Sequence, residues 1–221
     1  YEPLVPLDRQ PRIQDRGVVN LLLKVSALDF EPGTSYHYSN SGYAVLAVIV
    51  ETITNQAFET FLQERIFNPS KMSQSVAFVQ GQNEIPNRAL GYTVREAEVK
   101  ETDQSAYSAV LGDGGVYSSI ADLTTWHRVG FGRALISDRL FKAMMTPALE
   151  RYGFGWRIDQ FEGHTRYHHS GSTSGFRNFI AHFPNIDLTL MLLTNRAGPD
   201  ALPIGEEILR LYFEQELIQA K

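Results

Sequence analysis

The sequence predicts an α+β fold in which a mainly helical region precedes an antiparallel sheet and a C-terminal helix. Apolar residues recur at helical spacing in much of the first 150 residues, whereas short β-rich runs separated by turn residues fill most of 151–221. Helices followed by a run of adjacent strands are typical of α+β proteins. We therefore expect a helical region over 1–150 and a sheet region over 151–221, within one domain.

The first region is expected to contain five helices and one stretch without a clear element. Residues 2–16 hold three prolines and read as irregular, and 80–116 is polar and glycine-rich. The expected helices cover 18–25, a stretch from Ser41, 58–66, 121–129 and 138–145. The helix from Ser41 is expected to bury one face, formed by Tyr43, Leu46, Ala47, Val50 and Ile53.

The second region changes from helical to strand periodicity. Four short β-rich runs are expected to form an antiparallel meander, at 152–158, 165–169, 176–183 and 188–194. A last helix follows Pro199 and Asp200, and its apolar residues predict one buried face, made of Ile204, Ile208, Leu211 and Tyr212.

Composition limits the classes of function. The 221 residues are 43% hydrophobic and 20% charged, which is ordinary for a folded protein. A net charge of −5, with Lys and Arg scattered singly, offers no basic stripe, so nucleic acid is not an expected partner. The chain has no cysteine, which excludes disulfides and thiolate metal sites. Its longest apolar run, 44–50, is much shorter than the ~20 residues of a membrane-spanning helix.

Two short motifs carry residues suited to acyl transfer. Tyr38-Ser39-Asn40 lies just before the long amphipathic helix, and His169-Ser170-Gly171 lies at the end of an expected strand. Each is weak alone. Asn40 or Ser41 can simply cap the helix, and a lone histidine beside a glycine-containing hairpin is most often a strand residue. Their order and the sequence around them make them informative.

With these surroundings the chain resembles class C β-lactamases, DD-peptidases and related family VIII-type esterases. Residues 30–34 (FEPGT) followed by 38–43 (YSNSGY) resemble the second catalytic motif of that family. Residues 112–119 (GDGGVYSS), which include Gly114 and Gly115, resemble its glycine-rich segment, and 169–176 (HSGSTSGF) resemble its third motif. The resemblance extends from about Asp15 to the last helix and implies a β-lactamase/transpeptidase-like fold.

The family's first motif, Ser-x-x-Lys, is absent from the 221 residues. None of the residues three positions before a lysine is serine; they are Leu21, Asn68, Ala97, Arg139 and Ile218. In the family this motif lies upstream of Tyr-x-Asn and supplies the nucleophile. The chain also opens on Tyr1 rather than Met. We therefore expect that it is the C-terminal part of a serine hydrolase, that the N-terminal part of the fold lies outside it, and that it is inactive alone.

The resemblance implies a role for each matching residue. Tyr38 would help to move the serine's proton to the leaving group, and Asn40 would hold the substrate amide or the family lysine. The backbone N–H of Ser172 would be an oxyanion donor, since the other donor in the family is the N–H of the nucleophile. Flanking positions would bind substrate; these are Ser170, Gly171, Gly114 and Gly115. The resemblance implies no cofactor.

His169 stands where β-lactamases carry lysine, and the His-x-Gly form is more typical of DD-peptidases, D-aminopeptidases and esterases. The substrate is therefore expected to be a small ester, an amide or a β-lactam, with esterase or peptidase activity favoured. If the neutral imidazole is the useful form, activity should rise over pH 6 to 8. Secretion or a periplasmic location is implied by the resemblance alone.

The same residues admit three other interpretations. A metal site formed by His164, His168 and His169 is disfavoured because His169 points to the opposite face of its strand and no nearby carboxylate completes the set. A Gly-x-Ser-x-Gly elbow fails because 171–175 has Thr173 in the central place. A non-catalytic binding module stays open, with plausible cleft aromatics at Tyr36, Tyr107, Tyr117, Tyr152 and Trp156.

Without the N-terminal part of the fold, a strand edge and an apolar face would be uncovered. The expected partner is therefore a complementary N-terminal fragment or a second copy of the chain in a homodimer.

Overall fold

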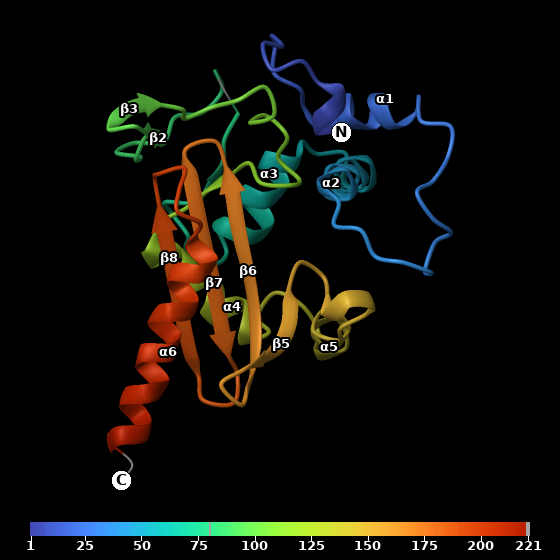
Figure 1. Ribbon diagram of the computed structural model, residues 1–221. Coiled ribbons are helices and arrows are strands. Elements are labelled where there is room, and N and C mark those ends of the chain that lie inside the picture. Colours follow the sequence, from blue (N-terminus) through green and yellow to red (C-terminus); the bar gives the residue numbers. More distant parts are fainter. Residues whose placement is uncertain (80, 220–221) are drawn as a thin grey trace. The chain divides into compact units, whose positions relative to one another are not determined.

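The computed structural model describes residues 1–79 and 81–219 (Figure 1). They form two compact units: the first comprises Tyr1–Arg88 and Gln104–Leu135, and the second comprises Ala89–Asp103 and the chain from Ile136 onward. This division differs from the stretches 1–150 and 151–221 because a short hairpin and one helix from the first stretch belong to the unit that contains the sheet.

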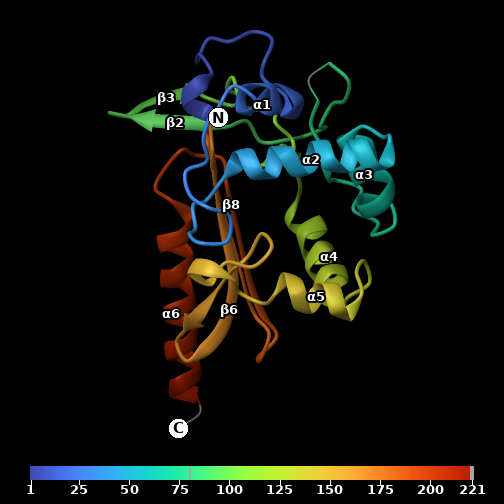
Figure 2. The same ribbon diagram turned by 90° about the vertical axis from the view of Figure 1, so that its right-hand side faces the viewer.

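The first unit is mainly helical. Its elements are η1 (Glu2–Leu4), α1 (Asp15–Leu22), α2 (Asn40–Thr54), α3 (Phe58–Leu62), the π-helical η2 (Gln63–Phe67), α4 (Ile120–Phe131), and the two-stranded antiparallel pair of β1 (Val76–Ala77) with β4 (Val116–Tyr117). Figure 2 shows α1 beside α2, with which it packs. All four helices expected in this unit are present, although α1 begins before residue 18 and ends before residue 25.

In the described chain no single helix is long and apolar enough to span a membrane. Only α2 and α3–η2 taken together have the required length and hydropathy, and this pair is bent by 79°.

The buried face of α2 matches the expected one only in part. Ala47 is buried and Tyr43 and Val50 are half-buried, as expected, whereas Leu46 is 52% exposed and Ile53 is 78% exposed. Ala44, which was not expected to be buried, is fully buried. A Cβ built on Gly112 would lie 2.3 Å from the backbone oxygen of Tyr43, so the glycine-rich segment packs directly on the helix backbone. Small residues allow that close approach. The buried face of α2 is therefore set by alanine and glycine, and the bulky aliphatic residues lie beside it.

The second unit contains a four-stranded antiparallel sheet in the order β5-β6-β7-β8. Its strands are β5 (Arg157–Phe161), β6 (His164–Thr173), β7 (Phe176–Phe183) and β8 (Leu188–Thr194). The last three were expected. The first strand was expected at 152–158 and lies a few residues later, at 157–161, because the chain bends at Phe154 and Gly155, where Gly155 has φ +80°. The turn from β5 to β6 places Glu162 at φ 46° and Gly163 at φ 80°, the left-handed pair that matches the twist of a hairpin.

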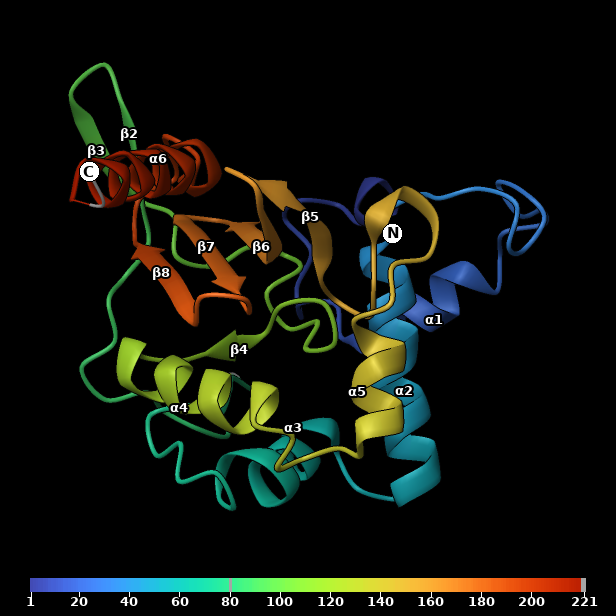
Figure 3. The same ribbon diagram turned by 90° about the horizontal axis from the view of Figure 1, so that it is seen from below.

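The unit also contains α5 (Asp138–Met144), η3 (Leu149–Arg151) and α6 (Ala201–Gln219). The last of these helices runs along one face of the sheet (Figure 3). The core of this unit consists of Phe161, Phe179, Ala181, Phe183, Ala201, Leu209 and Phe213. The expected buried face of α6 was wrong, since Ile208, Leu211 and Tyr212 are 41%, 52% and 39% exposed. A Cβ on Gly205 would come within 2.3 Å of the Phe179 ring, so the helix lies in direct contact with the sheet at Gly205, while Leu209 and Phe213 of the same helix enter the core.

A hairpin of β2 (Tyr92–Arg95) and β3 (Glu98–Glu101) occupies part of the stretch that showed no clear element. Its turn residues are Glu96 and Ala97, both with positive φ. Neither is a usual turn residue, so the sequence gives no turn signal here. The base of this hairpin holds the β6–β7 turn, since the N–H of Gly175 donates to the backbone oxygen of Thr102 at 2.8 Å.

Candidate active site

Tyr38 and Asn40 are positioned by the start of α2. The cap of this helix is Ser39, whose Oγ accepts a hydrogen bond from the N–H of Gly42 at 3.0 Å, and not Asn40 or Ser41 as expected. Ser39 has extended backbone, which turns its hydroxyl back toward the first turn. Asn40 is consequently the first helical residue, and its Nδ2 donates to Oε1 of Glu2 at 2.7 Å. Tyr38, immediately before the cap, is 42% exposed.

A buried carboxylate fixes the glycine-rich segment in the same unit. Asp15, at the start of α1, accepts hydrogen bonds from the N–H groups of Leu111 and Gly112, both at 2.9 Å. Burial raises the pKa of Asp15, and the two backbone donors oppose that rise. Sequence reasoning missed this residue, because an acidic residue in the first turn of a helix is common and carries no sign of a distant partner.

The glycines of this segment differ in their surroundings. A Cβ on Gly115 would lie 2.9 Å from the Cα of Leu111, whereas one on Gly114 would meet nothing within 4 Å. Gly112 rests on Tyr43, which is one turn after Asn40. The structure thus brings the glycine-rich segment against α2 near its N-terminal end. Substrate binding by Gly114 and Gly115 stays a prediction.

His169 lies on β6 in the second unit, and both of its ring nitrogens have partners there. Nδ1 lies 2.8 Å from the backbone oxygen of Ser170, and Nε2 lies 3.0 Å from the hydroxyl of Tyr152. Burial lowers the pKa of His169; the Ser170 carbonyl opposes this and the positive charge of Arg157 adds to it. The imidazole is therefore largely neutral at pH 7.

The residues after His169 lie on an open edge of the sheet. β5 pairs with β6 only as far as His168, whereas β7 pairs with β6 up to Thr173. On the β5 side, Ser170, Gly171 and Ser172 therefore face no strand of the described sheet, and all three are exposed. Unpaired backbone groups on a strand edge can bind an extended substrate or a developing oxyanion. The N–H of Ser172 stays a predicted oxyanion donor.

Both motifs lie within a stretch that matches a known protein family. The sequence model of the family described as Beta-lactamase matches residues 18–212. The chain belongs to the beta-lactamase family. The matched range includes every predicted site residue.

Relatives in this family are similar over most of the chain. A D-aminopeptidase of Gluconobacter oxydans is 26% identical over 189 residues, which is 82% of this chain and 35% of the relative. Penicillin-binding protein 4* of Bacillus subtilis is 28% identical over 185 residues, which is 76% of this chain and 41% of the relative. The chain thus spans well under half the length of these relatives.

Solved structures of similar fold include a penicillin-binding protein homologue and a D-amino acid amidase. The octameric penicillin-binding protein homologue from Pyrococcus abyssi matches with a TM-score of 0.79 at 22% identity, over 93% of this chain and 49% of that one. The D-amino acid amidase from Ochrobactrum anthropi matches with a TM-score of 0.78 at 18% identity, over 97% and 68%. The predicted β-lactamase/transpeptidase-like α+β fold is confirmed.

The three histidines of β6 have separate surroundings in this beta-lactamase-family sheet. His164 stacks on Phe213 with centroids 5.1 Å apart, and Nε2 of His168 lies 3.3 Å from Oδ2 of Asp159. A carboxylate is thus near His168, contrary to expectation. It is engaged by Arg166, which forms two hydrogen bonds with it, at 2.7 and 2.9 Å. Among the described residues no group of three or more His, Cys, Asp or Glu could hold a metal ion.

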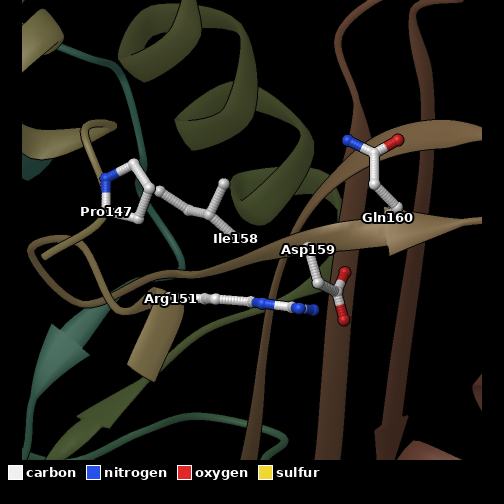
Figure 4. Close-up of a pocket in the computed structure, with 5 residues that line it drawn as sticks. All are labelled: Pro147, Arg151, Ile158, Asp159 and Gln160. Carbon is white, nitrogen blue, oxygen red and sulfur yellow. The ribbon is translucent and has the colours of Figure 1, made fainter. Parts of the chain in front are cut away.

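Arg166 is the centre of a buried ion network that sequence reasoning missed. Its side chain is 5% exposed, pairs with Asp159, and also donates to Oε1 of Glu206 on α6 at 2.9 Å. The network joins β5, β6 and α6. Asp159 also borders a cavity of about 390 Å³ (Figure 4), whose other lining residues are Pro147, Arg151, Ile158 and Gln160. None of the predicted site residues lines it.

Acid should weaken the fold through His168. Burial, together with the charge of Arg166, lowers the pKa of His168 to about 4, although Asp159 opposes this. The unfolded chain takes up the proton near pH 6.5, whereas the folded chain resists it. The free energy of unfolding should therefore fall by up to about 3 kcal/mol between pH 6.5 and 4.

Urea unfolding at pH 7, 5.5 and 4.5 measures this slope. His168→Gln should flatten it, and His37→Gln, which removes an exposed histidine, should leave it unchanged. An equally steep slope in His168→Gln would assign the acid sensitivity to other groups.

Proposed function

We propose that this chain is the C-terminal part of a serine hydrolase that cleaves esters, D-amino-acid amides and peptides, or β-lactams through an acyl-enzyme. The observation that carries the proposal is the pair of motifs in a family-matched chain: Tyr38-x-Asn40 at the start of α2 and His169-x-Gly171 on an open strand edge. The names of the relatives, a D-aminopeptidase and a penicillin-binding protein, favour the same class of chemistry.

In this reaction the nucleophilic serine and its lysine come from a Ser-x-x-Lys motif upstream of Tyr1. Tyr38 passes the proton of the serine to the leaving group, helped by the positive charge of the lysine, because a free phenol with a pKa near 10 is a poor proton carrier at neutral pH. Asn40 holds the substrate amide or the lysine. The N–H of Ser172 donates to the oxyanion of the tetrahedral intermediate.

The neutral state of His169 favours esters and amides over β-lactams, since a lasting positive charge is what clamps a β-lactam carboxylate. Burial lowers the pKa of His169, so its neutral form already dominates at pH 6.5. The rise of activity that depends on this group is therefore expected below pH 6.5, and not over pH 6 to 8.

The partner proposed for the chain is a complementary N-terminal segment. Three aliphatic residues of α2 support it: Leu46, Ile49 and Ile53 are 52%, 44% and 78% exposed and recur at helical spacing. β8 lies at the edge of its sheet, where one more strand can pair. A homodimer that covers the same surfaces is the alternative outcome, and analytical ultracentrifugation of the purified chain distinguishes the two.

The chain alone is expected to be inactive toward nitrocefin, a p-nitrophenyl ester and a D-Ala-D-Ala peptide. The same chain extended by the sequence encoded before Tyr1 should hydrolyse at least one of them, because it then carries the nucleophile. The matched control is the extended protein with alanine in place of the Ser-x-x-Lys serine. Turnover by the 221-residue chain, or none by an extended protein that contains Ser-x-x-Lys, contradicts the proposal.

A non-catalytic binding module is the second candidate, and the lack of Ser-x-x-Lys in the 221 residues favours it. The coding sequence upstream of Tyr1 discriminates the two. If the whole reading frame lacks the motif, the protein binds its ligand without acylation.

A further inference from the structure

Tyr152 is a residue outside the three family motifs that contacts one of them directly. Its hydroxyl lies 3.0 Å from Nε2 of His169, and the two rings meet edge to face with centroids 6.0 Å apart. Arg157 lies over the Tyr152 ring, with its guanidinium carbon 5.6 Å from the centroid. Tyr152 thus connects the turn before β5 to the histidine on β6.

The hydrogen-bond partners of His169 determine which ring nitrogen carries the proton. The backbone oxygen of Ser170 can only accept, so Nδ1, 2.8 Å away, must be the donor. A neutral imidazole then has its lone pair on Nε2. The hydroxyl of Tyr152 must therefore donate to Nε2, and the two bonds favour the same tautomer.

The backbone around Tyr152 is held tightly, which makes its hydroxyl a fixed donor. The N–H of Tyr152 donates to the oxygen of Leu149 at 3.1 Å, and its own oxygen accepts from Ala148 at 2.9 Å. A Cβ on Gly153 would lie 2.3 Å from the oxygen of Met144, and Gly155 has φ +80°. Neither position tolerates a side chain without movement of the turn.

We propose that Tyr152 is a positioning residue for His169. Its hydroxyl donates to Nε2, keeps the imidazole in the Nδ1–H tautomer and fixes the ring relative to the open edge at Ser170 and Ser172. The tautomer is a property that the 221-residue chain has by itself, whereas its importance for turnover rests on the proposed function.

Imidazole ¹⁵N NMR of the ¹⁵N-labelled chain at pH 7 tests the proposal without an activity assay. His169→Gln removes one set of ring signals and so assigns His169. The wild-type ring is expected to be the Nδ1–H tautomer. In Tyr152→Phe the ratio of Nδ1–H to Nε2–H should fall about fivefold, since one neutral hydrogen bond contributes roughly that factor. Tyr212→Phe, which removes a hydroxyl on α6 of the same unit, should leave the ratio unchanged.

An Nε2–H tautomer in the wild-type chain overturns the proposal, even if Tyr152→Phe fails to fold. An unchanged ratio in a folded Tyr152→Phe chain overturns it as well. In the extended enzyme, Tyr152→Phe is expected to lower kcat with little change in KM. If the tautomer shifts but neither extended protein turns over substrate, the positioning role stands and the proposed function fails.

Discussion

Replacing Tyr38 by phenylalanine in the extended enzyme is expected to lower kcat by roughly 10²- to 10⁴-fold, the usual contribution of a general acid–base group. The change removes one oxygen and keeps the ring. Tyr38 lies immediately before the Ser39 cap, and its side chain is 42% exposed. Steady-state kinetics on the best substrate of the panel measure the loss.

Tyr43→Phe is the matched control for Tyr38→Phe, since it removes a phenol hydroxyl one turn into the same helix. We expect it to change kcat little. A Tyr38→Phe enzyme with more than a tenth of wild-type kcat would show that another group moves the proton. Equal losses in both variants would point to damage to α2 and not to proton transfer.

Replacing Arg166 by alanine is expected to cost about 3–5 kcal/mol of unfolding free energy, because removing one partner of a buried ion pair leaves the other charges uncompensated. The Arg166 side chain is 5% exposed and has carboxylates from β5 and α6 at 2.7 and 2.9 Å. Without it, Asp159 and Glu206 lose the cation that they share, and Glu206 keeps only the exposed Arg210. Urea unfolding followed by Trp156 fluorescence in a Trp126→Phe background reports on this unit.

Two further variants separate charge from packing. Arg210 also pairs with Glu206, at 3.6 Å, but its side chain is 45% exposed, so Arg210→Ala should cost less than about 1 kcal/mol. Arg166→Met combined with Asp159→Asn and Glu206→Gln should recover much of the lost stability, since no buried charge is then unpaired. A loss below 1 kcal/mol in Arg166→Ala would rule out the network as a main support of the sheet.

The sequence was most informative where backbone pattern and turn chemistry agree. β7 and β8 coincide with the runs predicted at 176–183 and 188–194, because β-rich residues are bounded there by turn residues. The β2–β3 hairpin could not be predicted, since its turn uses Glu96 and Ala97. The buried face of α2 was predicted only in part and that of α6 was wrong. Helical periodicity was read from bulky apolar residues, whereas the close contacts of these helices are made at small residues such as Ala44 and Gly205.

For the candidate site, the order of the motifs was enough to select Tyr38, Asn40 and His169. It did not identify the residues that contact and position the motifs. The contacts of Asp15 with Gly112 and of Tyr152 with His169 join residues far apart in sequence. The same holds for Arg166 and Glu206. Such pairs depend on tertiary packing, and no local pattern encodes them.

Because α6 packs so closely on the sheet, substitutions in this helix can affect the His-Ser-Gly motif from a distance. Gly205 rests on the ring of Phe179, and Phe179 is the β7 residue directly opposite Ser170. Any side chain added at position 205 displaces either the helix or that ring, and a displaced ring shifts the strand that pairs with the His-Ser-Gly segment. The C-terminal helix can therefore tune the geometry of the third motif from the far side of the sheet, and selection for a different substrate can act there while every motif residue stays the same.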